Sequence, residues 1–170
     1  YNNPFFKDFL LPSGRLREWR FGSRRAQIII VTKCPAEPSE AEEHVWRKNL
    51  GIKNNQQLFF STLEYHTAFN VFDPNEKFHL SPTMHVTLIS AVAQSSYLVN
   101  YIEDKVATVL DINYEDHHFF SKDEVLSLIE KHKAKNSTNK IILTTEKDAT
   151  RLALFKHIFE EHNIKLYAIP

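Results

Sequence analysis

The sequence predicts an α/β protein whose mostly parallel sheet carries helices on both faces. Short runs rich in β-branched residues recur along the chain, and several are apolar without interruption, as expected for strands buried on both faces. Segments with helical periodicity separate these runs at short intervals, which favours parallel strands joined by crossover helices. The strands are expected at residues 27–32, 57–63, 86–92, 106–110, 141–145 and 165–169.

The helix starts are predicted from capping patterns. In a capping box, a Ser or Thr side chain bonds to a backbone N–H three residues later, and an acidic side chain there returns the bond. The pairs with this spacing are Ser39 and Glu42, Ser121 and Glu124, and Thr145 and Asp148. Gly51 predicts a left-handed end to the first of these helices. A further helix is expected to begin around 94–96, and residues 65–83, which show little periodicity, are expected to form a loop or a short excursion.

Composition bounds the class of protein. The chain has 170 residues, which we expect to form a single α/β unit over residues 1–170. Lys and Arg total 21 and Asp and Glu total 21, so the zero net charge argues against bulk nucleic-acid binding. The single cysteine, Cys34, indicates a reducing compartment. No apolar run approaches the roughly 20 residues that cross a bilayer, so we expect this chain to be soluble.

Two further features concern what the chain lacks. It contains only 3 glycines, so no glycine-rich phosphate loop is present. It also begins with Tyr1 instead of Met, and we therefore expect it to be a piece of a longer protein.

The most promising chemical centre is the turn between the strand at 106–110 and the helix that Ser121 begins. It carries Asp116, His117 and His118, and α/β folds place ligands at such strand ends. One interpretation is a metal site, although adjacent residues in extended chain point to opposite sides. A second is a pair of structural histidines beside a helix cap. A third is an acid–base or substrate-orienting imidazole near a carboxylate.

Two other segments permit an anion site. Five arginines fall within eleven residues beside Trp19 and Phe21, namely Arg15, Arg17, Arg20, Arg24 and Arg25. They form either a solvated basic loop or a phosphate site, because guanidinium groups bind phosphate bidentately. The second segment, 144–148, joins a strand to a helix N-terminus, where anions are favoured. There the simpler interpretation is that Thr145 and Asp148 cap the helix, although Lys147 in the first turn opposes the helix dipole.

Four motifs, taken in order, resemble one family. They are LPSGRLRE at 11–18, IVTKCP at 30–35, DHH at 116–118 and TTEKDA at 144–149. This series is similar to the tetraacyldisaccharide 4′-kinases of lipid A biosynthesis over nearly the whole chain, and the strand end at 30–35 resembles the Bacteroidetes branch. Trp19, where the family often has proline, and the proline-free turn at 94–96 are local departures.

The resemblance implies a fold related to P-loop NTPases and a defined reaction. Such enzymes transfer the γ-phosphate of ATP, with Mg²⁺, to the 4′-hydroxyl of the lipid A disaccharide 1-phosphate precursor. They act at the cytoplasmic face of the inner membrane, as peripheral or N-terminally anchored proteins. In the family, the phosphate loop and an acidic motif precede the segment matched by 11–18. The chain is therefore expected to be the C-terminal portion, with ATP and Mg²⁺ bound mainly by an N-terminal half, and to be inactive alone.

The resemblance also implies roles for single residues. Arg17 matches an active-site arginine, and charge stabilisation of the transferring phosphoryl group is the role that the chemistry requires of it. Glu18 is expected to hold Arg17, with Arg15 in a supporting role. His117 matches the imidazole that works with an aspartate of the N-terminal half to activate the sugar hydroxyl. Asp116 and His118 are expected to support it. The residues that match TTEKDA, left open between catalytic and structural roles, are Thr145, Glu146, Lys147 and Asp148.

Two interpretations from other classes remain open on the sequence alone. One is a non-catalytic α/β anion-binding or scaffold domain that uses the basic segment. The other is a metal-dependent hydrolase that uses His117 and His118.

Overall fold

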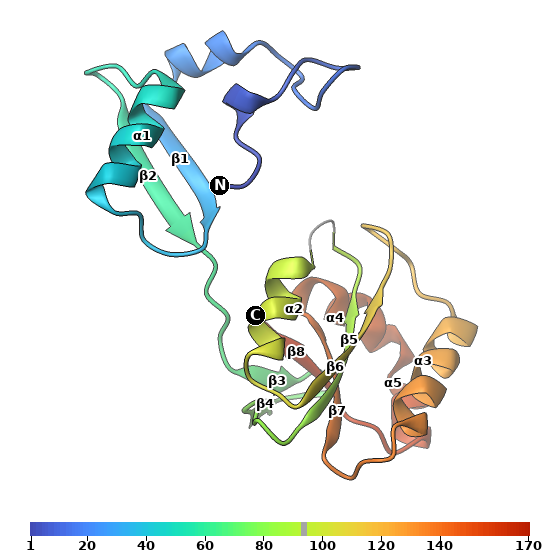
Figure 1. Cartoon of the computed structure of the whole chain (residues 1–170). Coiled ribbons are helices and arrows are strands. Elements are labelled where there is room, and N and C mark those ends of the chain that lie inside the picture. The colour runs from blue at the N-terminus through green and yellow to red at the C-terminus, as the bar shows by residue number, and fades with distance from the viewer. Residues whose placement is uncertain (93–94) are drawn as a thin grey trace. The chain divides into compact units, whose positions relative to one another are not determined.

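The chain divides into two compact units, residues 1–64 and residues 65–170, in a computed structural model that describes residues 1–92 and 95–170 (Figure 1). The sequence led us to expect a single unit, and that expectation was wrong. The physical reason is that the strands form two separate sheets, one of two strands and one of six. Each sheet has its own buried residues, so each unit has a hydrophobic core of its own.

The first unit is a two-stranded parallel sheet covered by one helix. Its elements are η1 (Phe5–Lys7), η2 (Arg20–Arg25), β1 (Ile28–Cys34), α1 (Glu40–Leu50) and β2 (Gln57–Thr62). Ser39 and Glu42 form the predicted capping box, and Gly51 ends α1 with a φ of 64° in the left-handed region. The core contains Val31, Cys34 and Leu58, against which Trp46 of α1 packs.

Within its described residues, 65–92 and 95–170, the second unit has a six-stranded mixed sheet and five helical segments. Its elements are β3 (Ala68–Asn70), β4 (Asp73–Phe78), β5 (His85–Ser90), α2 (Ser96–Glu103), β6 (Thr108–Asn113), α3 (Lys122–Ala134), β7 (Lys140–Thr145), α4 (Glu146–Leu152), η3 (Ala153–Phe155), α5 (Lys156–Glu161) and β8 (Leu166–Ile169). The strand order is β4-β3-β8-β7-β5-β6, and the last four are parallel. The predicted α/β class with a mostly parallel sheet is therefore confirmed.

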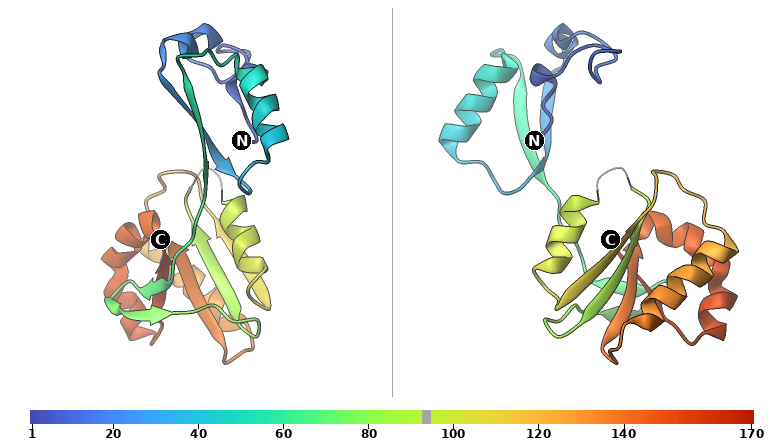
Figure 2. Two further views of the ribbon diagram at one scale, coloured as in Figure 1. Left: turned by 90° about the vertical axis from the view of Figure 1, so that its left-hand side faces the viewer. Right: turned by 45° about the vertical axis from the view of Figure 1, so that its right-hand side comes forward.

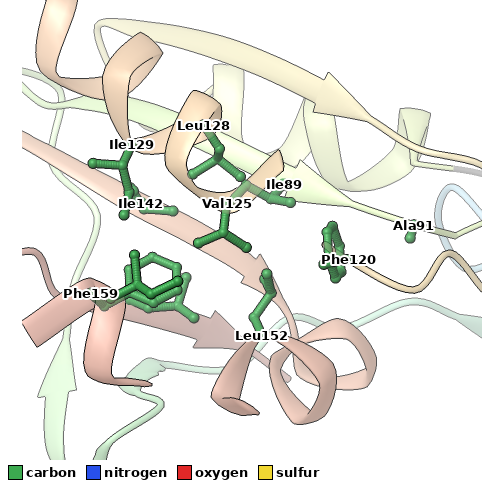
Figure 3. Close-up of a cluster of buried hydrophobic side chains, with 11 residues drawn as sticks. Ile89, Ala91, Phe120, Val125, Leu128, Ile129, Ile142, Leu152 and Phe159 are labelled. Carbon is green, nitrogen blue, oxygen red and sulfur yellow. The ribbon is translucent and has the colours of Figure 1, made fainter. Parts of the chain in front are cut away.

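Helices cover both faces of this sheet, because its strands alternate apolar residues between the two sides. In β5, Ile89 packs into a cluster with α3, α4 and α5, whereas Val86 and Leu88 pack on the other face with α2. Figure 3 shows the first cluster, with Val125 and Leu128 of α3 facing Ile89 and Ile142 of the sheet. Figure 2 shows α2 on one side of the sheet and α3 and α5 on the other. The strands at the centre are thus buried on both faces.

The segment 65–83, expected to be a loop or a short excursion, contributes two short antiparallel strands. β4 contains Pro74 and lies at the edge of the sheet, where a missing N–H donor is tolerated. The Glu76 carboxylate fixes this edge, because it accepts hydrogen bonds from Lys165 Nζ at 2.6 Å, Tyr167 Oη at 2.8 Å and Asn70 Nδ2 at 2.8 Å. These donors, Lys165 first, lower the pKa of Glu76 to about 2. Burial, together with the bond to Glu76, raises the pKa of Tyr167 to about 12.

Two helices differ in detail from the prediction. The helix expected to begin around Gln94 begins at Ser96, and Gln94 itself lies outside the described residues. The helix expected after Thr145 is divided into α4, η3 and α5. Within residues 1–92 and 95–170, no helix has both the length and the apolar character needed to cross a membrane.

Candidate functional site

The candidate site lies at the carboxyl edge of the parallel strands in the second unit. β5 pairs in parallel with β6 on one side and with β7 on the other, so these three strands end at the same edge of the sheet. The turn after β6 carries Asp116 and His117, and α4 begins directly after β7. The fold therefore brings together two motifs that lie about 30 residues apart in sequence, as the hydrogen bond between Asp116 and Lys147 shows with a separation of 31.

Asp116 connects the two motifs. Its Oδ1 accepts a hydrogen bond from Lys147 Nζ at 2.7 Å, and its Oδ2 lies 3.6 Å from His117 Nε2. The bond from Lys147 is the main reason that the pKa of the Asp116 carboxyl lies below its usual range. The cation that opposes the dipole of α4 thus has a partner on the neighbouring turn.

His117 has an unusual backbone conformation. Its φ is 67°, in the left-handed region that only a few per cent of residues other than Gly adopt, with Asn, Asp and His the more frequent among them. Such conformations cluster at functional sites because the surrounding structure must hold them in place. Here the N–H of His118 bonds to the carbonyl of Glu115 at 3.1 Å and closes the turn. The His117 side chain is 71% exposed, so its imidazole is accessible to a ligand.

The buried carboxylate of Asp148 connects the site to the interior of the second unit. Its side chain is fully buried and accepts hydrogen bonds from the backbone N–H of Ala91 at 2.9 Å and the hydroxyl of Thr145 at 2.8 Å. Thr145 in turn accepts a bond from the Asp148 N–H at 3.1 Å, which caps α4 as predicted. Asp148 also pairs with Arg151 at 3.2 Å. These contacts support the structural interpretation of Thr145 and Asp148. Glu146 is exposed at the start of α4.

Arg151 is the residue that sequence reasoning missed. Its Nη2 lies 3.4 Å from His117 Nδ1, and its guanidinium lies 5.7 Å from the centre of the Phe119 ring. The available signal was the spacing of Asp148 and Arg151, since residues three apart on a helix are neighbours. Its proximity to His117, 34 residues away, required the fold.

His118 contacts other residues than His117 does. Its Nε2 lies 3.0 Å from Glu124 Oε1, and its ring stacks on Tyr114 with 4.6 Å between centroids. Glu124 forms the predicted capping box with Ser121, whose backbone N–H is the main reason that the pKa of Glu124 is lowered. The two imidazoles therefore have different partners, which disfavours their joint use as metal ligands.

The basic segment that contains Arg17 belongs to the first unit and borders a cavity. A cavity of about 230 Å³ is lined by residues that include Arg17, Glu18 and Trp19. Glu18 was expected to hold Arg17, and the ion pair that its carboxylate makes is with Arg25, whose Nη2 lies 2.7 Å away. The 3-10 helix η2 brings Arg25 back toward Glu18.

Arg15 also has a local partner, since its Nε lies 3.2 Å from Asp8 Oδ2. Backbone N–H groups, that of Phe9 first, lower the pKa of Asp8. Arg17 and His117 belong to different units.

Comparison with known proteins decides the family. The family model described as LpxK, tetraacyldisaccharide-1-P 4′-kinase, matches residues 1–170. The chain belongs to this family. The resemblance seen in the four sequence motifs is thereby confirmed.

Curated members of the LpxK family match over most or all of the chain. The tetraacyldisaccharide 4′-kinase of Bacteroides thetaiotaomicron is 32% identical over 181 residues, covering 100% of this chain and 47% of that protein. The enzyme of the same name from Flavobacterium psychrophilum is 34% identical over 157 residues, covering 90% of this chain and 43% of that protein. The chain thus spans about half the length of the curated relatives it matches.

A solved structure shares the fold of this LpxK family member. The crystal structure of LpxK from Aquifex aeolicus in complex with ATP superposes with a TM-score of 0.56 and 20% identity, covering 96% of this chain and 43% of that one. This similarity agrees with the predicted P-loop-related α/β fold.

Proposed function

We propose that this chain is the C-terminal portion of a tetraacyldisaccharide 4′-kinase, which transfers the γ-phosphate of ATP to the 4′-hydroxyl of the lipid A disaccharide 1-phosphate precursor. Membership of the LpxK family supports the reaction. The observation that carries the proposal is the left-handed, exposed His117, set between the Asp116–Lys147 pair and Arg151 at the carboxyl edge of the sheet. We place the working enzyme at the cytoplasmic face of the inner membrane, where its lipid substrate lies.

In this proposal, His117 acts on the sugar hydroxyl together with an aspartate of the N-terminal portion. A positioned imidazole contributes by hydrogen bonding or proton transfer near the attacking oxygen. Arg17 stabilises the charge of the phosphoryl group during transfer, as a guanidinium does in phosphoryl-transfer sites. Asp116, His118 and the residues of TTEKDA shape the turn that holds His117.

The described residues of this chain do not form a Mg²⁺–ATP site by themselves. Among residues 1–92 and 95–170, no group of three or more His, Cys, Asp or Glu side chains could hold a metal ion. The sequence also has no glycine-rich phosphate loop. We therefore propose that ATP and Mg²⁺ are bound mainly by the N-terminal portion of the kinase.

The test is to replace the proposed residues in the full-length kinase that contains this sequence. His117→Ala should lower turnover by about 10²- to 10⁴-fold, the usual contribution of a positioned acid or base. Arg17→Ala should lower it by about 10²- to 10³-fold, as for a lost charge-stabilising donor. ATP-dependent phosphorylation of the disaccharide 1-phosphate measures both, and circular dichroism verifies folding.

Two matched controls are available. His157→Ala removes an exposed histidine from α5, and Arg24→Ala removes a second arginine from the basic segment. Both variants should retain near-normal turnover. Normal turnover in His117→Ala or Arg17→Ala would refute the role of that residue, and phosphorylation by the 170-residue chain alone would refute the proposed division between two portions.

A further inference from the structure

Arg151 lies between a buried anion and an exposed imidazole. On one side, its Nη1 is 3.2 Å from Asp148 Oδ1, and Asp148 is fully buried. On the other side, its Nη2 is 3.4 Å from His117 Nδ1. The Arg151 side chain is only 20% exposed, and its guanidinium also contacts the Phe119 ring.

The position of the Arg151 guanidinium is fixed by the contacts of Asp148. The other oxygen of Asp148, Oδ2, is already engaged by the Ala91 N–H and the Thr145 hydroxyl, which connect it to the end of β5 and to β7. The remaining oxygen therefore faces Arg151 in a defined direction. Because a guanidinium is planar and rigid, fixing one nitrogen on Asp148 also aims the other nitrogen.

Hydrogen-bond chemistry then determines the state of the imidazole. Arginine is always a donor, so His117 Nδ1 must accept and must carry the lone pair. A neutral imidazole that accepts at Nδ1 carries its proton on Nε2. The nearest carboxylate oxygen to that nitrogen, Asp116 Oδ2, is 3.6 Å away, which is too far for a good hydrogen bond. Asp116 is meanwhile bonded to Lys147 at 2.7 Å.

We propose that Arg151 is a positioning residue that holds His117 as the neutral tautomer with its proton on Nε2. That N–H is then directed outward as a donor for a further carboxylate. The buried Asp148 carboxylate fixes the guanidinium of Arg151, and that guanidinium in turn orients the His117 imidazole. The role in catalysis rests on the proposed function, in which an aspartate of the N-terminal portion works with His117. The role in fixing the tautomer does not.

The first test is nitrogen NMR of the histidine side chains in the full 170-residue chain, in alkaline buffer where a free imidazole is neutral. The wild type should show His117 as a single tautomer with an unprotonated Nδ1. Arg151→Met, which keeps the length of the side chain but removes its donors and charge, should give averaged shifts from two tautomers. Lys156→Met, which removes an exposed cation from α5, should leave the His117 signals unchanged. Identical His117 shifts in the wild type and Arg151→Met would overturn the proposal.

The second test measures steady-state kinetics in the full-length kinase. Arg151→Met should lower kcat by about 10- to 100-fold, as is usual for residues that orient a functional side chain. The KM for the disaccharide should change little. Arg151→Lys should recover only part of kcat, because an ammonium lacks the rigid fork. A change confined to KM would mean that Arg151 binds substrate and would overturn the positioning role. Full turnover in His117→Ala would instead refute the proposed role of His117 in catalysis, while the NMR comparison would still decide whether Arg151 fixes the tautomer.

Discussion

The two sheets of this chain differ in how completely they are covered. The central strands of the second unit are buried on both faces, with α2 on one side and α3, α4 and α5 on the other. In the first unit, α1 covers one face of the two-stranded sheet, while Ile28, Ile30 and Phe59 remain 54%, 56% and 50% exposed. Parallel sheets are normally buried on both faces, so the second unit has the more complete core.

The same difference extends to the candidate functional residues. In the second unit, His117 is connected through Arg151 to Asp148, which is fully buried. In the first unit, the basic segment rests on exposed ion pairs such as that between Glu18 and Arg25, and η2 contains no buried residue. Surface pairs of this kind contribute little to stability. The basic segment has a buried support of a different kind, because the buried Gln56 side chain donates hydrogen bonds to the backbone carbonyls of Ser23 at 2.9 Å and Ala26 at 2.7 Å. That support holds the backbone of η2, whereas Asp148 and Arg151 reach a candidate functional side chain.

The largest expected effect comes from the shared core of α5 and the sheet. Phe159 is fully buried in the second unit, so Phe159→Ala should lower the free energy of unfolding of that unit by about 3–5 kcal/mol. Both tryptophans, Trp19 and Trp46, lie in the first unit. Their fluorescence should therefore follow an unchanged transition in urea, while circular dichroism shows the loss in the second unit. An equal shift in both signals would contradict the independence of the two cores.

A smaller effect is expected from acid. His132 is 5% exposed in α3, and its Nδ1 lies 2.9 Å from Thr87 Oγ1. Burial, and then the nearby Lys140 ammonium, lower the pKa of His132 to about 4 from the usual 6.5. The folded state thus resists protonation of this group. Its contribution to stability is complete above pH 6.5 and is lost progressively as the pH falls toward 4.

The size of this loss follows from the difference between the two pKa values. It corresponds to about 3 kcal/mol across that interval. Urea unfolding at several pH values, followed by circular dichroism, measures it for the second unit. His132→Gln should flatten the dependence between pH 4 and 6.5, whereas the exposed control His157→Gln should keep it. A wild type whose stability is constant over this interval would refute the assignment.

Local patterns in the sequence predicted the elements well, whereas partners distant in the chain were missed. The capping boxes at Ser39 and Ser121 and the left-handed Gly51 depend on residues within a few positions, so a sequence pattern specifies them. Arg151 depends on His117, and β4 depends on Lys165 and Tyr167 from the far end of the chain. These partners are too far apart in the sequence for a local pattern to indicate them. The ion pair between Glu18 and Arg25 was likewise not predicted, since η2 brings these two residues together.

The smallest expected effect tests the exposed face of the first unit directly. Ile30 and Val31 are neighbours in β1, but Ile30 is 56% exposed and Val31 is 7% exposed. Ile30→Thr keeps a β-branched side chain on an accessible face and should change the free energy of unfolding by no more than about 0.5 kcal/mol. Val31→Thr, the matched change on the covered face, buries a hydroxyl and should cost about 1–3 kcal/mol. Tryptophan fluorescence in urea measures both, because Trp46 packs against the cluster that contains Val31. A loss from Ile30→Thr as large as that from Val31→Thr would show that this face is covered in the isolated chain, and the contrast between the two sheets would then disappear.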